Sequence, residues 1–288
     1  MDQRLADLLA LLELEALEVN LFRGESRDIG SPQVFGGQVL GQALSAAART
    51  VAAARVVHSL HAYFLRRGDC NAPIVYQVDR SLDGHSFSNR RVVAIQHGEQ
   101  IFNMAASFQV AEEGFDHQID MPQVPAPESL SDYSGPPADV LTRLPERVRR
   151  FFEQPRPFEF RMVQPIDYLR PRIELPLRQM WFRAVGQLPD DEMLHRRLLA
   201  YVSDFFLLDT TTLPHGTSFV RPSIVMASID HALWFHRSLR VDEWLLYAME
   251  SPSASGARGF ARASVFARDG RLVASAAQEG LVRMVKER

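Results

Sequence analysis

The feature that most constrains the fold is an order of helix and strands that occurs twice along the chain. The first helix of this pattern is predicted over residues 35–50 and precedes strands over 56–65, 74–79, 88–96 and 100–110. A second helix, over residues 190–208, precedes strands over 223–235, 243–251, 258–268 and 271–285. Tight turns that contain glycine join successive strands in each set, so each set is expected to form an antiparallel sheet.

Two short segments in corresponding places support an internal duplication. Residues 59–67 and 229–237 carry the same dipeptide at the same position, as His61-Ala62 and as His231-Ala232, about 170 residues apart. Both segments follow a predicted helix and precede a three-strand meander. The sequence therefore predicts an α+β chain of two repeats, each with a long helix packed on an antiparallel sheet.

A proline-rich stretch separates the two repeats. Seven prolines lie among acidic and serine residues between positions 116 and 155, a composition typical of a connecting segment. We expect an N-terminal unit with a leading helix at residues 1–115, a linker at 116–155 and a C-terminal unit at 156–288.

Composition narrows the range of partners and compartments. With 32 basic and 35 acidic residues, the 288-residue chain has a formal net charge of -3 and lacks the basic surface of a nucleic-acid-binding protein. It has no apolar run of about 18 residues that would span a bilayer, so no membrane partner is expected. The single cysteine, Cys70, cannot form an internal disulfide, which favours a reducing cytoplasm.

Three polar residues of the second repeat fall on faces that are otherwise apolar, where an unpaired polar group is costly. Asp204 lies within the helix predicted over 190–208, and its neighbours three and four residues away are uncharged. Gln278 interrupts an apolar row in the last strand, and Ser228 lies on one face of the strand predicted over 223–235. Each also has an ordinary structural interpretation: an edge carboxylate that reaches solvent, a glutamine bonded to backbone groups, and a common strand serine.

The first repeat lacks these three groups. His58 corresponds to Ser228, Ala106 corresponds to Gln278, and no carboxylate lies near residues 44–47, which correspond to Asp204. The two repeats are therefore expected to be alike in structure and unequal in chemistry. His58 is interpreted first as a structural residue and second as a catalytic one.

Motifs of several common enzyme classes are absent from the sequence. It contains no dinucleotide-binding fingerprint, no phosphate-binding Walker loop, no G-x-S-x-G nucleophile motif and no H-E-x-x-H metal motif. An enzyme that relies on Asp, Ser and Gln side chains would most simply activate a water molecule.

The chain resembles the acyl-CoA thioesterase II family over nearly its whole length. The segments that carry the resemblance are residues 21–24, 33–39, 58–66, 83–87, 229–231, 234–237, 243–247, 255–259 and 278–280. The resemblance implies a double hotdog fold, in which each of two antiparallel sheets wraps a long helix. It also implies hydrolysis of fatty acyl-CoA to free fatty acid and coenzyme A, without a metal or a bound cofactor.

The family's active site consists of an Asp, a Thr or Ser, and a Gln, which by motif fall on Asp204, Ser228 and Gln278. We expect Asp204 to act as general base toward water, with Ser228 and Gln278 fixing its geometry. The backbone near Gly36-Gly37 is a candidate for the oxyanion donors. Arginines such as Arg66, Arg258 and Arg262 are candidates for contact with the phosphates of CoA.

The sequence leaves alternatives to thioester hydrolysis open. A non-catalytic acyl-CoA binding or sensing protein is the main alternative. A hotdog hydratase would need an Asp/His pair, and the only histidine in the helix of Asp204 is His195. Because hotdog units commonly associate, a homodimer or homotetramer is expected.

Overall fold

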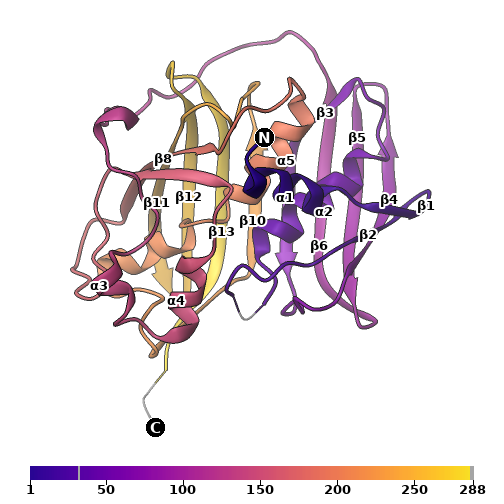
Figure 1. Ribbon diagram of the computed structural model, residues 1–288. Helices are drawn as coiled ribbons and strands as arrows, with labels where there is room; N and C mark the ends of the chain where they lie inside the picture. Colours follow the sequence, from indigo (N-terminus) through magenta and orange to yellow (C-terminus); the bar gives the residue numbers. More distant parts are fainter. Residues whose placement is uncertain (32, 286–288) are drawn as a thin grey trace.

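The structure is a computed structural model that describes residues 1–31 and 33–285. Its central element is one continuous antiparallel sheet (Figure 1). The sheet has thirteen strands in the order β1-β2-β4-β5-β6-β3-β10-β13-β12-β11-β8-β7, with β9 also paired to β13. The strands of the first half are β1 (Glu15–Glu18), β2 (Leu21–Gly24), β3 (Arg55–Phe64), β4 (Ile74–Asp83), β5 (Phe87–Gln96) and β6 (Glu99–Val110). Those of the second half are β7 (Phe158–Met162), β8 (Leu177–Ala184), β9 (Ile224–Ser228), β10 (Asp230–Phe235), β11 (Leu245–Ser255), β12 (Arg258–Ala267) and β13 (Leu272–Met284).

Strands β3 and β10 join the two halves edge to edge. They pair in antiparallel register, with Leu60 opposite Leu233 and Ser59 opposite Trp234. These strands carry the two segments whose similarity predicted a duplication. The duplicated segments therefore lie at the centre of the sheet, where the two halves join.

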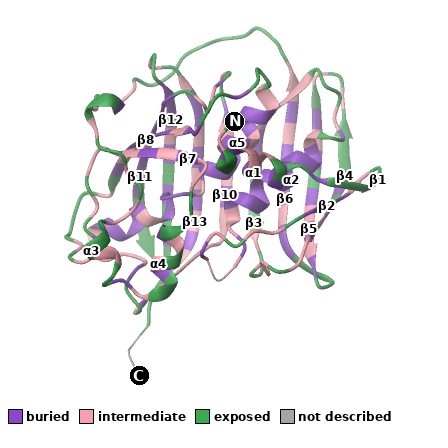
Figure 2. Ribbon diagram, in the orientation of Figure 1, coloured by how far each residue is buried: buried purple, intermediate pink, exposed green. Residues whose placement is uncertain are grey.

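Two buried helices lie side by side on one face of this sheet: α2 (Gly36–Ala48) from the first half and α5 (Glu192–Val202) from the second (Figure 2). The small residues of α2 permit this close approach, because a Cβ atom on Gly37 would lie only 2.1 Å from the backbone oxygen of Tyr201. The shorter helix α1 (Gln3–Leu12) packs beside α2 through Leu5, Leu8 and Leu12. The prediction of two hotdog-like units, each with one long helix on an antiparallel sheet, is confirmed.

Residues between the halves form several short helices: η1 (Pro127–Ser129), α3 (Ala138–Leu141) and α4 (Glu146–Glu153). Figure 1 shows α3 and α4 beside the strands of the second half. Val148 and Phe152 of α4 are buried against Tyr168 and Val220 in a small apolar cluster of their own. This packing brings α4 to the candidate site described below.

Two sequence predictions were wrong in ways that affect the site. The helix predicted over 190–208 ends at Val202, because Ser203 caps it and Phe206 adopts a left-handed conformation with φ of 65°. A separate 3₁₀ helix, η2 (Leu208–His215), follows. The strand predicted over 223–235 is interrupted at Ile229, which separates β9 from β10. None of the described helices combines the length and the apolar character that crossing a membrane requires.

Candidate active site

Asp204 lies immediately after the C-terminal end of α5 rather than within a helix. The Ser203 hydroxyl donates to the backbone oxygen of Ala200 at 3.0 Å and closes the last turn. The chain then leaves the helix axis and directs the Asp204 side chain toward the sheet, where only 6% of it is exposed. The sequence correctly indicated a buried carboxylate, although the local structure that buries it is a helix end.

A single amide connects the three residues singled out from the sequence. Nε2 of Gln278, in β13, donates to Oδ1 of Asp204 at 2.7 Å and to Oγ of Ser228 at 3.1 Å. Gln278 is completely buried, as the apolar row in the last strand predicted. The structure therefore brings together Asp204, Ser228 and Gln278, which come from three separate elements.

An extra residue between β9 and β10 decides which side chains reach this site. Ser228 pairs with Gly280, whereas Ala232 pairs with Ala277, so four residues on one strand span three on the other. The bulge reverses the alternation, so Asp230, which an unbroken strand would place on the same face as Ser228, no longer shares that face. Its carboxylate instead accepts the backbone N–H of Glu279 at 2.6 Å.

The same bulge turns His231 toward Asp204, a residue that sequence analysis did not associate with the site. Its Nδ1 lies 4.0 Å from Oδ1 of Asp204, and its Nε2 lies 2.9 Å from the hydroxyl of Ser203. Burial lowers the pKa of His231 to about 4, so the ring is neutral at physiological pH. Strict alternation along residues 223–235 placed this ring on the opposite face, and no signal in the sequence marked the bulge.

The first half contributes the N-terminus of α2 to the site. Gly36 lies so close that a Cβ atom there would be 2.6 Å from Oδ2 of Asp204. Phe35 at the N-cap makes no side-chain capping bond, so the positive end of α2 is directed at the carboxylate. The site is thus shared between the halves, with Asp204 from one and a helix N-terminus from the other.

Burial determines the protonation behaviour of Asp204. Its pKa is raised from 3.8 to about 6, chiefly by desolvation; the Gln278 amide and the backbone N–H of Gly37 oppose the shift, and the negative charge of Asp209 adds a smaller contribution to it. A carboxylate with this pKa is ionised at pH 7 and still basic enough to accept a proton from water. Such tuning is characteristic of a general base.

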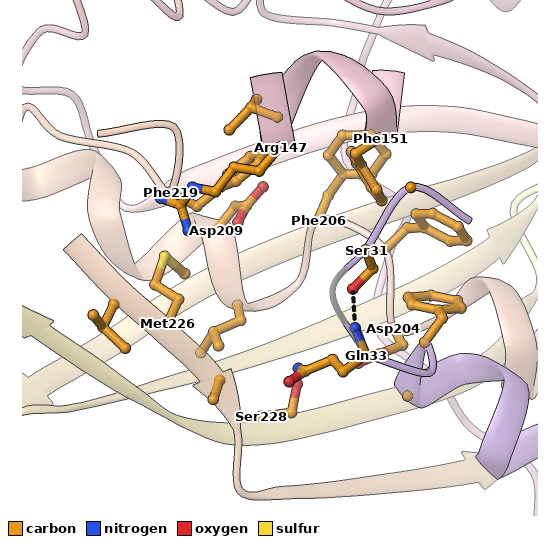
Figure 3. A pocket seen from close by; sticks show the side chains of 18 of the residues that line it. Ser31, Gln33, Arg147, Phe151, Asp204, Phe206, Asp209, Phe219, Met226 and Ser228 are labelled. Atoms are coloured by element: carbon orange, nitrogen blue, oxygen red, sulfur yellow. Dashed lines mark hydrogen bonds between the residues drawn. The ribbon is translucent and has the colours of Figure 1, made fainter. Parts of the chain in front are cut away.

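Asp204 and Ser228 line a cavity of about 420 Å³, a volume in the range of small-molecule sites (Figure 3). Its polar and charged lining residues include Ser31, Gln33, Arg67, Arg147 and Asp209. The rest of the lining is mostly apolar and includes Val34, Phe35, Val148, Phe151, Phe152, Phe205, Phe206, Leu208, Phe219, Ile224 and Met226. Gln278 and His231 do not line the cavity, so they act on it only through Asp204 and Ser228.

Other residues considered from the sequence lie elsewhere. His58 bonds through Nε2 to the hydroxyl of Ser107 at 2.8 Å and is not part of the cavity wall. The three candidate phosphate ligands are engaged by carboxylates: Arg66 with Glu99, Arg258 with Glu279, and Arg262 with Glu250. The arginines that do line the cavity are Arg67 and Arg147, and both are exposed.

No group of three or more His, Cys, Asp or Glu side chains arranged to hold a metal ion occurs within residues 1–31 and 33–285. The chemistry that the site itself offers is that of a buried base beside a hydroxyl group. Both groups face a cavity lined by polar and apolar side chains.

The fold and the site together define a hotdog-fold thioester hydrolase, and comparisons with known proteins identify the family. Residues 23–109 match the family model described as "Acyl-CoA thioesterase N-terminal domain", and residues 169–281 match the one described as "Acyl-CoA thioesterase". The chain belongs to the acyl-CoA thioesterase family.

Individual relatives agree with this assignment. The chain is 44% identical to acyl-CoA thioesterase 2 of Haemophilus influenzae, over 98% of this chain and 99% of that one. It is 40% identical to human acyl-coenzyme A thioesterase 8, over 98% of this chain and 91% of that one. A crystal structure of an acyl-CoA thioesterase II from Mycobacterium marinum superimposes with a TM-score of 0.79 at 43% identity, covering 96% of this chain and 98% of that one.

Proposed function

We propose that the protein hydrolyses fatty acyl-CoA to free fatty acid and coenzyme A, using a water molecule activated by Asp204. The observation that carries the proposal is the arrangement around Gln278, whose one amide nitrogen holds both the Asp204 carboxylate and the Ser228 hydroxyl. Asp204 and Ser228 face the cavity, so a water molecule between them would be oriented by two groups of fixed position.

In the proposed reaction, ionised Asp204 removes a proton from water as the water oxygen attacks the thioester carbonyl carbon. The carbonyl oxygen becomes an oxyanion, and the positive N-terminal end of α2 at Gly36-Gly37 favours this negative charge. The carbon–sulfur bond then breaks. Coenzyme A leaves as a thiolate, the acyl group leaves as a fatty acid, and Asp204 returns its proton to solvent or to the thiolate.

Ser228 and Gln278 have different parts in this scheme. The Ser228 hydroxyl accepts a hydrogen bond from Gln278, so its own proton remains available to the attacking water or to the carboxylate. Gln278 is buried behind both groups and is a positioning residue. Family members often carry Thr at the position of Ser228. Ser supplies the same hydroxyl group, but its side chain is less restricted in rotamer because it lacks the β-branch of Thr.

The two ends of the cavity suit the two parts of the substrate. Ser31 and Arg67 suit the pantetheine and phosphate groups of CoA, and the part of the cavity lined by Phe206, Leu208 and Met226, its acyl end in this scheme, suits the acyl chain. In the domain division that we propose, Asp204, Ser228 and Gln278 belong to the unit at 156–288. The unit at 1–115 supplies Gly36, and the segment at 116–155 supplies the α4 wall of the acyl end.

A hydratase is disfavoured despite the proximity of His231 to Asp204. The imidazole is fully buried, its Nε2 is bonded to Ser203, and it does not reach the cavity. It therefore cannot exchange a proton with a bound substrate. Nothing in the site specifically favours the alternative of a non-catalytic binding protein.

The test is release of free CoA thiol from acyl-CoAs of four to eighteen carbons by the wild type and by Asp204→Asn. We expect turnover by the wild type and a loss of roughly a hundredfold or more in the variant. Asp190→Asn is a matched control, because Asp190 lies just before α5 and is 98% exposed. Wild-type binding of acyl-CoA without thiol release, or full activity in Asp204→Asn, would refute the proposal.

A further inference from the structure

We propose that the acyl end of the cavity contains a polar subsite, centred on Asp209, that binds a hydroxyl group carried at the far end of an acyl chain. The inference rests on the proposed function, because it assumes that the acyl chain occupies the apolar part of the cavity. It identifies a class of substrate, the distally hydroxylated acyl-CoAs, beyond simple fatty acyl-CoA.

Asp209 is the second carboxylate that lines the cavity, and it lies away from the first. Figure 3 shows Asp209, Arg147 and Phe219 grouped on the side of the pocket opposite Asp204, Ser31 and Gln33. Apolar side chains line the cavity with them, among them Phe206, Leu208 and Met226. A chain that begins at Asp204 and follows these side chains therefore ends beside a carboxylate.

Asp209 has no protein partner that accounts for its position. Among the described residues, no hydrogen bond or ion pair to its carboxylate is formed. Burial raises its pKa from 3.8 to about 6, and the cationic Arg178 only partly opposes this. A carboxyl group left without a partner in such a place costs stability, so its presence is explained better by a ligand than by the fold.

A second, smaller cavity of about 30 Å³ adjoins the first and shares Asp209 and Phe219 with it. The hydroxyls of Thr217 and Ser218 belong to residues that line this cavity, and both oxygens are buried without a hydrogen-bond partner among the described residues. The cavity holds little more than one small polar group. Unsatisfied hydroxyls beside an unpaired carboxyl group form a set of donors and acceptors that a single ligand group could satisfy.

A hydroxyl group fits this set better than a carboxylate does. Asp209 accepts a hydrogen bond from a hydroxyl in either protonation state, and Thr217 and Ser218 can donate to the hydroxyl oxygen. A terminal carboxylate would face the charge of Asp209 at neutral pH. An unsubstituted chain would leave all these groups unpaired, and sites built to bond a hydroxyl discriminate strongly against analogues that lack it.

The experiment compares kcat/KM for three series of acyl-CoAs from eight to sixteen carbons: unsubstituted, ω-hydroxylated and ω-carboxylated. In the wild type we expect the ratio of ω-hydroxylated to unsubstituted substrate to peak at about tenfold at one chain length, the length that reaches Asp209. The ω-carboxylated series should show no such peak. A flat ratio at all lengths, or a preference for the carboxylated series, would overturn the inference.

Two variants test the assignment to Asp209. Asp209→Leu should abolish the peak, and Asp209→Asn, which keeps the shape and an acceptor oxygen, should retain most of it. The exposed Asp190→Asn serves as control. If Asp209→Leu lowered kcat/KM equally for both series, the residue would support the pocket rather than the hydroxyl, and the inference would fail. Failure of the proposed function looks different, because then the wild type would release no thiol even from unsubstituted acyl-CoA.

Discussion

Nε2 of Gln278 lies 2.7 Å from Oδ1 of Asp204 and stabilises the ionised carboxylate from inside the protein. Removing this donor in Gln278→Ala should raise the pKa of Asp204 above its value of about 6 and free the Ser228 side chain. We expect kcat/KM to fall by about ten- to a hundredfold at pH 7 and to recover partly at higher pH, where Asp204 ionises again. Gln100→Ala, at an exposed site that does not line the cavity, is the control. Superimposable pH profiles for Gln278→Ala and the wild type would contradict this role.

The wild-type enzyme should lose activity on the acid side at an unusually high pH for an aspartate. In the proposed mechanism Asp204 is the general base, so only its ionised form is active, and its pKa of about 6 places the midpoint there. Below this pH, kcat/KM should fall tenfold per pH unit. His231 stays neutral down to about pH 4 and adds no transition in this range. Rates measured from pH 5 to 9 with a saturable acyl-CoA test this, and a constant kcat/KM down to pH 5 would exclude Asp204 as the base.

The burial of Asp204 should also cost stability. The folded pKa of about 6 exceeds the unfolded value near 3.8, so the folded state holds the proton more tightly, and stability falls as pH rises through this window. Asp204→Asn removes that penalty and should be more stable than the wild type at pH 8 by at most about 3 kcal/mol. Loss of the Gly37 contact reduces the gain. Thermal unfolding at pH 8, 6 and 4 should show an advantage that shrinks toward pH 4, and an advantage of constant size would argue against a proton-linked cause.

The sequence predicted the repeated architecture because the two periodicities, 3.6 for helices and 2 for strands, are long-range patterns that local irregularities do not erase. It also identified Gln278 correctly as a buried polar residue, since β13 alternates regularly over Ala274, Ala276, Gln278 and Gly280. A regular helix or strand can be predicted from the sequence when the burial of its side chains follows the periodicity of that helix or strand.

The errors occur where the backbone departs from regularity. Helix α5 ends before Asp204, where Ser203 caps it and Phe206 adopts a left-handed conformation. Neither Ser nor Phe is a residue type that marks a helix end in a sequence. His231 reaches the site only because Ile229 forms a bulge. Only the three-dimensional structure shows that Asp209 lines a cavity and that its carboxyl group has no hydrogen-bond or ion-pair partner among the described residues. Such features depend on tertiary contacts, which no local pattern encodes.

The close approach of α2 to the Asp204 carboxylate predicts a specific effect of one methyl group. In Gly36→Ala the new Cβ would lie 2.6 Å from Oδ2 of Asp204, so the carboxylate must shift from its position beside Gln278. We expect kcat/KM to fall at least tenfold while the protein remains folded. Gly41→Ala on the same helix is the control, because its Cβ would crowd the flexible end of Leu12 at 2.8 Å and lie at an ordinary contact distance of 3.5 Å from the backbone oxygen of Arg197. Circular dichroism checks the fold of both variants, and wild-type kcat/KM in Gly36→Ala would contradict the proposed geometry.

Helix α4 should set the range of acyl groups that the enzyme accepts, because it lines the cavity although it lies outside the sheet. Phe151 of this helix lines the cavity, and the guanidinium of Arg156 stacks over its ring at 4.3 Å. Phe151→Ala removes the ring from the wall and should shift the optimum of kcat/KM toward longer or bulkier acyl chains. The lost packing and cation–π contact should lower stability by about 1–3 kcal/mol, since the ring is only partly buried.

Glu153→Ala, at an exposed position of the same helix, is the matched control for Phe151→Ala and should leave the chain-length profile unchanged. The measurement is kcat/KM across acyl-CoAs of four to eighteen carbons for the wild type and both variants. A profile that only decreases in height in Phe151→Ala, with its maximum at the same length, would mean that α4 supports the fold without contacting the acyl chain. A maximum displaced to longer chains would identify α4 as the element that determines specificity, because the ring then occupies the space that the additional carbons need.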